Sequence, residues 1–217
     1  ITGAGSGIGR ALALGCAARG ATIVLAGRRA GSIGIVQAEI EAAGGPAISV
    51  SCDVTSTVGR KLLCHTLAQR FGHLDLLVNN AGMALAGPIG TITDSDLERL
   101  LATNIHAPIA MVRDCLSLLR ASGSSPRVVN IGSVMGDIGH PLFAGYCASK
   151  FGLRGFSDAL RRELLPEGIG VTYVAPRATR TEGATAFAHL IEPFGMSVDD
   201  PSTAAASIIR AIESDSK

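Results

Sequence analysis

Residues 1–26 read ITGAGSGIGRALALGCAARGATIVLA, and this stretch decides the fold of the chain. Ile1 is expected to end a strand, TGAGSGIG (Thr2–Gly9) to form a turn, and GRALALGCAARG to form a helix that ends at Gly20. A second strand, ATIVLA, follows at once. Strand, glycine turn, helix and strand predict a βαβ unit, which binds a pyrophosphate on backbone N–H groups at the start of its helix. The alternative is a glycine turn with a purely structural role.

A tyrosine and a lysine lie four residues apart in YCASK, Tyr146–Lys150, and the tyrosine follows Ser133 by 13 residues. On a helix this spacing places both side chains on one face. A free phenol has a pKa of about 10, and a neighbouring ammonium is expected to bring that pKa down into the working range. The pattern therefore predicts that Tyr146 exchanges a proton with a substrate whose oxygen Ser133 holds. The same spacing also occurs on solvated helix faces that carry no chemistry.

The rest of the chain alternates apolar strands with helices, without a linker or a repeat. The expected strands are AISVSCDV, LDLLVNN, RVVNIGS and IGVTYVA. The expected helices run to about residue 44, over 58–71, from 94 to about 121, over 145–165 and from about 201. Apolar rather than alternating strands indicate a parallel sheet covered on both faces. We therefore predict an α/β fold with a doubly wound, Rossmann-like parallel sheet in three α/β/α layers, a single domain over residues 1–217, and a ligand crevice at the carboxyl ends of the strands.

Composition excludes several other classes of protein. The net charge of +1 without basic runs argues against nucleic acid as a partner. No apolar run reaches the roughly 18 residues that span a membrane. The five cysteines are an odd number without a C-x-x-C pair, which favours buried thiols in a reducing, cytoplasmic compartment over disulfides or a metal site. They are Cys16, Cys52, Cys64, Cys115 and Cys147.

Together these motifs resemble the short-chain dehydrogenase/reductase family. The glycine pattern matches the family's Thr-Gly-x-x-x-Gly-x-Gly, and NNAG at Asn79–Gly82 matches a second motif. PRATRT, Pro176–Thr181, stands where the family usually has Pro-Gly followed by a threonine. Four residues fall in the order and approximate spacing of the family's catalytic set, namely Asn104, Ser133, Tyr146 and Lys150. The resemblance covers essentially the whole chain and is nearly silent about the substrate.

The resemblance implies a nicotinamide dinucleotide cofactor along the sheet edge. The glycine turn would meet the pyrophosphate, CDVT the adenine, NNAG the ribose, and PRATRT the carboxamide, with Lys150 also at the nicotinamide ribose. For Asp53 in CDVT, the alternative is a cap of the next helix. The expected binding residues are Gly3, Ser6, Gly7, Ile8, Gly9, Asp53, Val54, Asn80, Ala81, Gly82, Tyr146, Lys150, Pro176, Thr179 and Thr181.

Asn104 lies in a long helical stretch although Asn is a mediocre helix former. Pro108, four residues on, has no N–H, so the carbonyl of Asn104 is expected to be free at a kink. In the family this site holds a water that links to the lysine as a proton relay. The alternative is an asparagine at a kink without chemistry.

The dipeptide Arg28-Arg29 follows the second strand, where folds that choose NAD place an Asp or Glu for the ribose 2′-hydroxyl. A guanidinium there binds a 2′-phosphate with charge-assisted paired hydrogen bonds. We therefore expect NADP(H) to be preferred over NAD(H), with Arg28 contributing more than Arg29. The alternative is that both arginines face solvent.

The sequence thus predicts an NADP(H)-dependent oxidoreductase that interconverts a carbonyl and a secondary alcohol. The alternatives are a dinucleotide-dependent epimerase or dehydratase, and a dinucleotide-sensing regulator without turnover. The resemblance also implies a homodimer or homotetramer built on the helices over 107–121 and 145–165. The first strand is expected to be incomplete and a seventh strand to be missing, because Ile1 leaves only a stub and the chain stops at IIRAIESDSK.

Two features near the expected pocket stay open from the sequence. Arg177 stands where the family usually has glycine, and it would either bind a substrate anion or point to solvent. The segment over 182–197 would be either an apolar lid over a hydrophobic substrate or ordinary helix core. Its apolar residues are Phe187, Leu190, Ile191, Phe194 and Met196.

Overall fold

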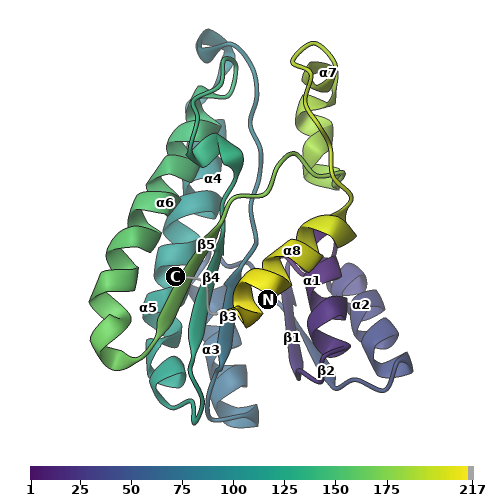
Figure 1. The fold of residues 1–217 in the computed structure, drawn as a ribbon, viewed down its shortest axis with the longest axis vertical. Helices are drawn as coiled ribbons and strands as arrows, with labels where there is room; N and C mark the ends of the chain where they lie inside the picture. The colour runs from purple at the N-terminus through teal and green to yellow at the C-terminus, as the bar shows by residue number, and fades with distance from the viewer. Residues whose placement is uncertain (215–217) are drawn as a thin grey trace.

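The structure is a computed structural model and describes residues 1–214 (Figure 1). The strands are β1 (Ile23–Gly27), β2 (Ala47–Ser51), β3 (Leu76–Asn79), β4 (Arg127–Ile131) and β5 (Gly170–Val174). The main helices are α1 (Gly7–Ala17), α2 (Ala30–Ala42), α3 (Thr57–Arg70), α4 (Asp94–Leu101), α5 (Ala107–Arg120), α6 (Ala144–Leu164), α7 (Ala188–Ile191) and α8 (Pro201–Glu213). The short helical turns are η1 (Ile89–Thr91), η2 (Ala102–His106), η3 (Val134–Gly136), η4 (Leu165–Glu167) and η5 (Glu182–Phe187).

The sheet is parallel throughout, and the first residues of the chain join its two parts. β1 pairs with β2, and β4 pairs with both β3 and β5. Between these groups, Thr2 N donates to Val78 O at 3.0 Å on one side, while Ala26 N donates to Ile1 O at 3.0 Å on the other. The strand order is therefore β2, β1, residues 1–4, β3, β4, β5. From residues 1–4 the chain first adds strands on one side of the sheet and then on the other, so the order of connection reverses there while all strands stay parallel. In a doubly wound sheet a ligand crevice opens at such a reversal, just beyond the strands' carboxyl ends.

Helices cover both faces of the sheet, so the predicted three-layer arrangement is confirmed. α1, α2 and α8 pack on one face around a core that contains Leu12, Ile33 and Ile208. α3, α5 and α6 pack on the other face around a core that contains Leu63, Met111 and Leu160. Figure 1 shows α1, α2 and α8 on one side of the strands and α3, α5 and α6 on the other. None of the described helices is long and apolar enough to cross a membrane.

Several element boundaries differ from the expected ones. α1 ends at Ala17 rather than Gly20, and β2 ends at Ser51, so that the CDV of AISVSCDV belongs to the following turn. The stretch from 94 to 121 is helical throughout but is not a single α-helix, because the π turn η2 separates α4 from α5. Pro108 follows this turn at the start of α5, where its missing N–H leaves a ladder bond unmade, so the helical stretch is interrupted where the kink was expected.

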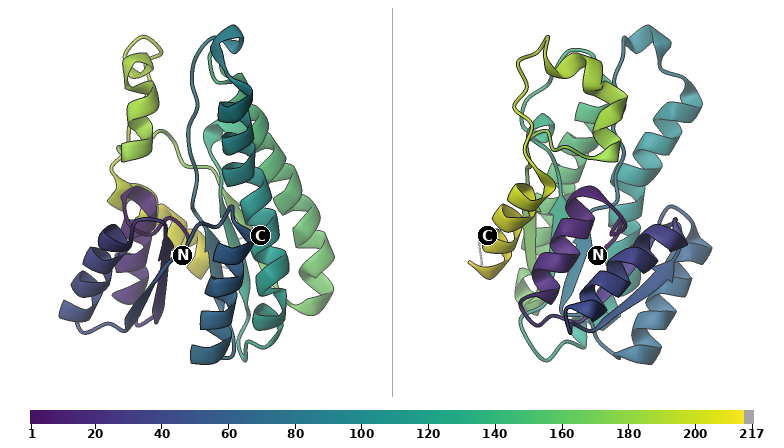
Figure 2. Two further views of the ribbon diagram at one scale, coloured as in Figure 1. Left: turned by 180° about the vertical axis from the view of Figure 1, so that it is seen from behind. Right: turned by 90° about the vertical axis from the view of Figure 1, so that its right-hand side faces the viewer.

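Residues 182–197 rise beyond the carboxyl edge of the sheet as η5, α7 and a return loop. Both views in Figure 2 show this segment standing apart from the sheet, on the same side of the molecule as the top of α4. A bridge between Thr179 and Asp199 closes its base, with Arg180 N donating to Asp199 O at 2.9 Å. We call residues 182–197 the lid segment.

Candidate active site

The glycine turn brings three backbone segments closer together than side chains would allow. A Cβ on Gly9 would lie 2.3 Å from the carbonyl oxygen of Gly3, and one on Gly3 would lie 2.9 Å from Cα of Ala81. Gly3 and Gly7 also have φ values of 63° and 53°, in the left-handed region that favours glycine. The first turn of α1 is therefore presented with bare backbone, and Ser6 at its N-cap makes no side-chain cap bond. Free N–H groups at a helix N-terminus bind anionic groups, so this cradle fits a pyrophosphate.

Thr2 and Asn80 hold the glycine turn against the end of β3. The Thr2 hydroxyl accepts from the backbone N–H groups of Asn80 and Ala81, both at 3.0 Å. The Asn80 amide donates to the carbonyl oxygens of Thr2 at 2.9 Å and Gly3 at 3.2 Å. The side chain of Asn80 is thus used to fix the turn, which leaves backbone and Ala81 to face the cavity.

The two arginines after β1 have different surroundings. Arg29 donates to Glu182 of the lid segment at 2.6 Å and to the Ser6 hydroxyl at 3.3 Å. Arg28 is exposed, lines the cavity and has no ion pair among residues 1–214. Of the pair, Arg28 is the guanidinium available to a new anion.

Asp53 does not cap the following helix, so that alternative is wrong. Its Oδ1 accepts from the Thr55 N–H at 2.9 Å and from the Thr55 hydroxyl at 2.7 Å, and the cap of α3 is Ser56. Burial alone would raise the pKa of Asp53, but the bonds from Thr55 outweigh burial and the pKa is lowered. An ionised carboxylate therefore lines the cavity beside Val54.

Ser133, Tyr146 and Lys150 meet where β4 and α6 converge. Ser133 follows β4 and accepts from Met135 N at 3.1 Å, while Tyr146 and Lys150 lie one turn apart on α6. The Lys150 Nζ is 5.7 Å from the centre of the Tyr146 ring and donates to the Ile131 carbonyl at 3.0 Å. The one-face geometry expected from YCASK is present.

The electrostatic effect expected from that pair is not present in this structure. Burial raises the pKa of Tyr146 to about 12, and the nearby Ser133 hydroxyl lowers it only in part. Burial also lowers the pKa of Lys150 to about 8. The expectation of a lowered tyrosine pKa is therefore wrong here. The physical reason is that desolvation of the ring dominates, while the ammonium is directed to a backbone carbonyl.

Asn104 is buried in the π turn and fixes the loop after β3. Its Oδ1 accepts from Met83 N at 2.9 Å, and its Nδ2 donates to Met83 O at 2.9 Å and to the Ser149 hydroxyl at 3.0 Å. Asn104 Oδ1 and Lys150 Nζ both lie within 4 Å of the position a Cβ would take on Gly82. Asn104, Gly82 and Lys150 are thus neighbours at the floor of the site.

Tyr173 is a contact residue that the sequence reasoning missed. Its phenol on β5 accepts from Ser133 N at 3.4 Å and donates to Ser133 O at 3.3 Å. A Cβ on either Gly132 or Gly136 would lie 2.2–2.3 Å from the Tyr173 ring or hydroxyl, so both glycines are needed for this packing. The signal available in the sequence was the pair of glycines in GSVMG (Gly132 and Gly136), together with a tyrosine in the following strand GVTYV.

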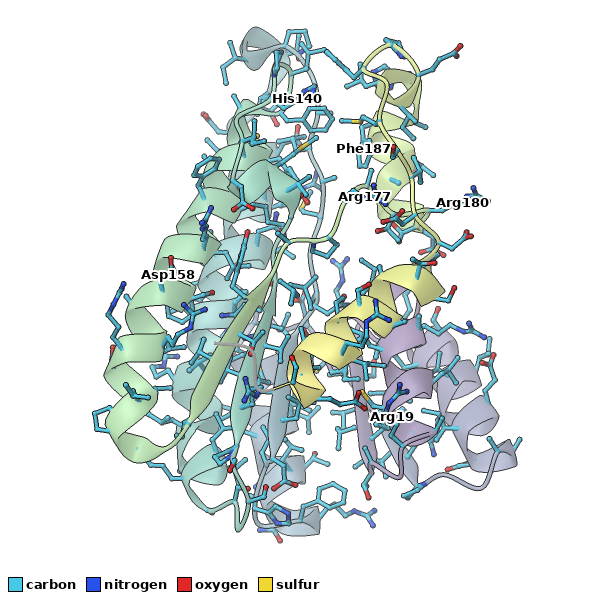
Figure 3. The ribbon with its side chains drawn as sticks, in the orientation of Figure 1. Arg19, His140, Asp158, Arg177, Arg180 and Phe187 are labelled. Carbon is cyan, nitrogen blue, oxygen red and sulfur yellow. The ribbon has the colours of Figure 1, made fainter. Side chains whose placement is uncertain are left out.

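The segment after β5 closes the cavity from the other side. Pro176, Thr179 and Thr181 all line it, and the Thr181 methyl packs where a Gly7 side chain would stand. Arg177 binds Asp199 through two hydrogen bonds, at 2.8 and 3.2 Å. Figure 3 shows Arg177 at the start of the lid segment. Its guanidinium is committed to that carboxylate, which disfavours the proposed contact with a substrate anion.

One cavity of about 560 Å³ joins the glycine turn to Ser133, Tyr146 and Lys150. We call the part beside the glycine turn, Arg28 and Asp53 the turn end, and the part beside Met135, Tyr146 and Phe187 the lid end. The predicted cofactor residues that line it are Gly3, Ser6, Gly7, Ile8, Arg28, Arg29, Asp53, Val54, Asn80, Ala81, Gly82, Tyr146, Lys150, Pro176, Thr179 and Thr181. Gly9 and Asn104 support the cavity from behind.

The chain is similar to several known proteins. The family model for the short chain dehydrogenases matches residues 1–189. A 3beta-hydroxysteroid dehydrogenase of Mediterraneibacter gnavus is 35% identical over 182 residues, which cover 83% of this chain and 65% of that protein. A short chain dehydrogenase of Burkholderia cenocepacia in complex with NADP has a TM-score of 0.88 at 30% identity, covering 98% of this chain and 88% of that chain. A 3-ketoacyl-(acyl-carrier-protein) reductase of Brucella melitensis complexed with NADH has a TM-score of 0.89 at 26% identity, covering 97% of this chain and 88% of that one.

The chain belongs to the short-chain dehydrogenase/reductase family. The predicted family, the doubly wound fold and the assignment as an oxidoreductase that works with NAD(P) are confirmed. One structural relative holds NADP and another NADH, so the likeness supports a nicotinamide dinucleotide without distinguishing the two.

Proposed function

We propose that this protein interconverts a carbonyl and a secondary alcohol, that it prefers NADP(H), and that Tyr146 is its acid–base residue. The observation that carries the proposal is the convergence of Ser133, Tyr146 and Lys150 in the same cavity as the glycine turn. A dinucleotide cradled by the turn and a substrate oxygen beside Tyr146 would then share one enclosed space.

When bound, the nicotinamide group supplies or accepts the hydride, and the side chains manage the proton. With its pKa raised to about 12, Tyr146 is protonated at neutral pH and is ready to donate to a carbonyl oxygen. The Ser133 hydroxyl, beside the phenol, orients that oxygen. Lys150, whose pKa is about 8, is mostly charged at pH 7 and stabilises the phenolate that forms. A water relay at Asn104 stays a prediction.

The preference for NADP(H) rests on Arg28. It is an exposed guanidinium at the turn end without an ion pair in the described chain, and Arg29 is already bound to Glu182. Paired charge-assisted hydrogen bonds to a 2′-phosphate give roughly tenfold to a hundredfold discrimination per bond.

The test is kcat/KM for NADPH and NADH, followed by cofactor absorbance over a panel of ketones and aldehydes. Arg28→Ala should lower the NADPH:NADH ratio by roughly tenfold or more, and Arg29→Ala, the matched control, should lower it much less. A wild-type enzyme that uses NADH as well as NADPH would refute the preference. Absence of turnover with every carbonyl compound and both cofactors would refute the reaction.

We further propose a cytoplasmic homodimer or homotetramer. α5 and α6 expose Ile109 and Phe151 at 39% and 43%, so these helices carry apolar side chains that a second copy would cover. Light scattering at micromolar concentration is the test, and a monomer would contradict it. The proposal treats residues 1–217 as one catalytic domain.

A further inference from the structure

The lid end of the cavity is lined by apolar side chains that meet around Tyr146. Phe143, Cys147 and Leu190 form a buried cluster, and Tyr146 and Phe187 pack against it. The ring centres of Phe143 and Phe187 are 5.6 Å apart in an edge-to-face arrangement, and those of Phe143 and Tyr146 are 6.4 Å apart. The lid segment is therefore held over the tyrosine by aromatic packing.

Some apolar side chains of this cluster remain partly exposed to the cavity. Phe187 and Met135 are only half-buried, and both line the cavity together with Met83. An ordinary helix core would enclose these side chains completely, whereas here they present apolar surface to the same space as the Tyr146 phenol. Unbranched methionines beside a rigid aromatic ring adapt to apolar ligands of irregular shape.

The charged side chains of the segment over 176–187 that line the cavity are already paired. Arg177 binds Asp199, and Glu182 binds Arg29. Along the described part of the cavity, the cations without a carboxylate partner are Arg28, at the turn end, and Lys150, which donates to Ile131. An anionic substrate would have to lose its hydration at the lid end, where the nearby Lys150 ammonium already donates to the Ile131 carbonyl.

Further exposed apolar side chains lie on segments next to the Phe143 and Cys147 cluster. Ile138 is 70% exposed, and Phe194 of the lid segment lies with its ring 4.5 Å from that of His140. Figure 3 shows His140 and Phe187 at the same end of the molecule. Ile89 is 74% exposed and follows Gly87, whose N–H donates to the Leu142 carbonyl at 2.8 Å. A substrate larger than the cavity would therefore meet more apolar surface.

We propose that the substrate is a neutral carbonyl compound, or its alcohol, with an apolar body of at least ring size attached to the reacting carbon directly or through a short chain. Short carboxylates, phosphates and sugars are excluded by the same surface. This inference rests on the proposed carbonyl–alcohol reaction and specifies its substrate class.

The experiment compares three methyl ketones that share one reacting group: 4-phenylbutan-2-one, 4-hydroxybutan-2-one and 4-oxopentanoate. Because even one methylene in a fitting apolar pocket is worth at least about tenfold in kcat/KM, the phenyl ketone should exceed each of the others by more than that factor. An equal or higher kcat/KM for 4-oxopentanoate would overturn the inference while leaving the reaction class intact.

Met135→Lys and Phe187→Ser test whether the preference for the phenyl ketone arises at the lid end. Met135→Lys supplies a further positive charge at the lid end and should shift the ratio of phenyl ketone to 4-oxopentanoate at least about tenfold toward the anion. Ile35→Lys is the matched control, since Ile35 is 62% exposed on α2 and outside the cavity lining. If Met135→Lys fails to fold, Phe187→Ser decides, because it should reduce kcat/KM for the phenyl ketone alone. An unchanged ratio in the folded variant would overturn the placement of the substrate at the lid end.

Binding separates this inference from the reaction itself. Calorimetry with Tyr146→Phe protein saturated with NADP⁺ should detect 4-phenylbutan-2-one and not 4-oxopentanoate. If no ketone is turned over by wild type but this binding difference holds, the reaction is wrong and the substrate class stands. If neither ketone binds and neither is turned over, the substrate class is wrong too.

Discussion

The turn end of the cavity is formed mainly by backbone groups, whereas the lid end is formed by side chains. At the turn end, the contacts are made by backbone groups that three glycines allow to approach one another, and Thr2 and Asn80 fix them with four hydrogen bonds. At the lid end, the surface consists of side chains on α6, on η3 and on the lid segment, whose base is closed by the bridge between Thr179 and Asp199. A backbone cradle tolerates almost no substitution, whereas a surface of apolar side chains can change residue by residue. The turn end therefore fits a dinucleotide, and we propose that the lid end selects the substrate.

The largest effect is expected from filling the turn. Gly9→Ala would place its Cβ 2.3 Å from a backbone oxygen that cannot move aside cheaply, so we expect a loss of about 3 kcal/mol in the free energy of unfolding. Dinucleotide affinity should fall at least about tenfold as the cradle shifts. Denaturant unfolding and fluorescence titration with NADPH measure the two.

Gly34→Ala is the matched control for the turn. Gly34 lies inside α2 with nothing within 4 Å of its Cβ position, so alanine there should stabilise the protein by about 0.5–1 kcal/mol. Equal effects of the two substitutions would show that the turn is not held as tightly as its geometry indicates.

A smaller effect is expected from the buried lysine where the two ends meet. Burial lowers the pKa of Lys150 from 10.5 to about 8, which corresponds to about 3 kcal/mol of unfavourable burial at pH 7. Lys150→Met should remove that cost and lose about 1 kcal/mol with the bond to Ile131, for a net gain of about 2 kcal/mol.

The stability gained by Lys150→Met should depend on pH, because the pKa of Lys150 is lower in the folded protein than in the unfolded chain. Between pH 8 and 10.5 the unfolded chain binds the lysine proton and the folded protein does not, so wild-type stability rises with pH in that window. The advantage of Lys150→Met should therefore be full below pH 8 and fade toward pH 10.5. A constant difference across this range would contradict the low pKa of Lys150.

A substitution at Tyr173 tests whether the position of Ser133 depends on its hydrogen bonds to β5. Tyr173→Phe removes the phenol that bonds both the N–H and the carbonyl of Ser133, at a cost of about 1 kcal/mol, so kcat should fall about fivefold with KM for the dinucleotide unchanged. The alkaline limb of the kcat profile should also shift, because Ser133 influences the pKa of Tyr146. An unaltered pH profile would leave Tyr173 with a packing role alone.

The smallest effect is expected where the lid segment touches the turn end. Arg29 and Glu182 form an exposed pair, with their side chains 59% and 66% accessible. Glu182→Gln should speed dinucleotide dissociation by no more than about fivefold in stopped-flow displacement. Asp200→Asn is the control, because Asp200 makes a looser pair with Arg180 at 3.8 Å. A change of a hundredfold in the first variant would mean that the lid segment controls dinucleotide release.

The turn end was largely predictable from the sequence because its geometry depends on residue types that have few alternatives. Only glycine fits at Gly3 and Gly9, and the order of apolar strands put TGAGSGIG, NNAG and PRATRT at one sheet edge. The lid end was not predictable in the same way. Whether Phe187 is core or cavity wall depends on long-range packing with Phe143, and the partner of Arg177 lies 22 residues further along the chain.

The pKa values of Tyr146 and Lys150 could not be predicted from the sequence either. The spacing of Tyr146 and Lys150 correctly predicted that they share a face of α6, but not that burial would raise the pKa of one and lower that of the other. The depth of a side chain below the surface and the direction of an ammonium toward Ile131 follow from the tertiary structure and cannot be read from a spacing of four residues.

The most direct test of the whole account is to measure dinucleotide affinity and turnover together in Tyr146→Phe. The phenylalanine keeps the ring that packs against Phe143 and removes only the hydroxyl. We expect an NADPH dissociation constant within about twofold of wild type and a kcat lower by about 10²–10⁴, the usual contribution of a positioned acid–base group. Turnover close to wild type with 4-phenylbutan-2-one, at full NADPH saturation, would contradict the role of Tyr146.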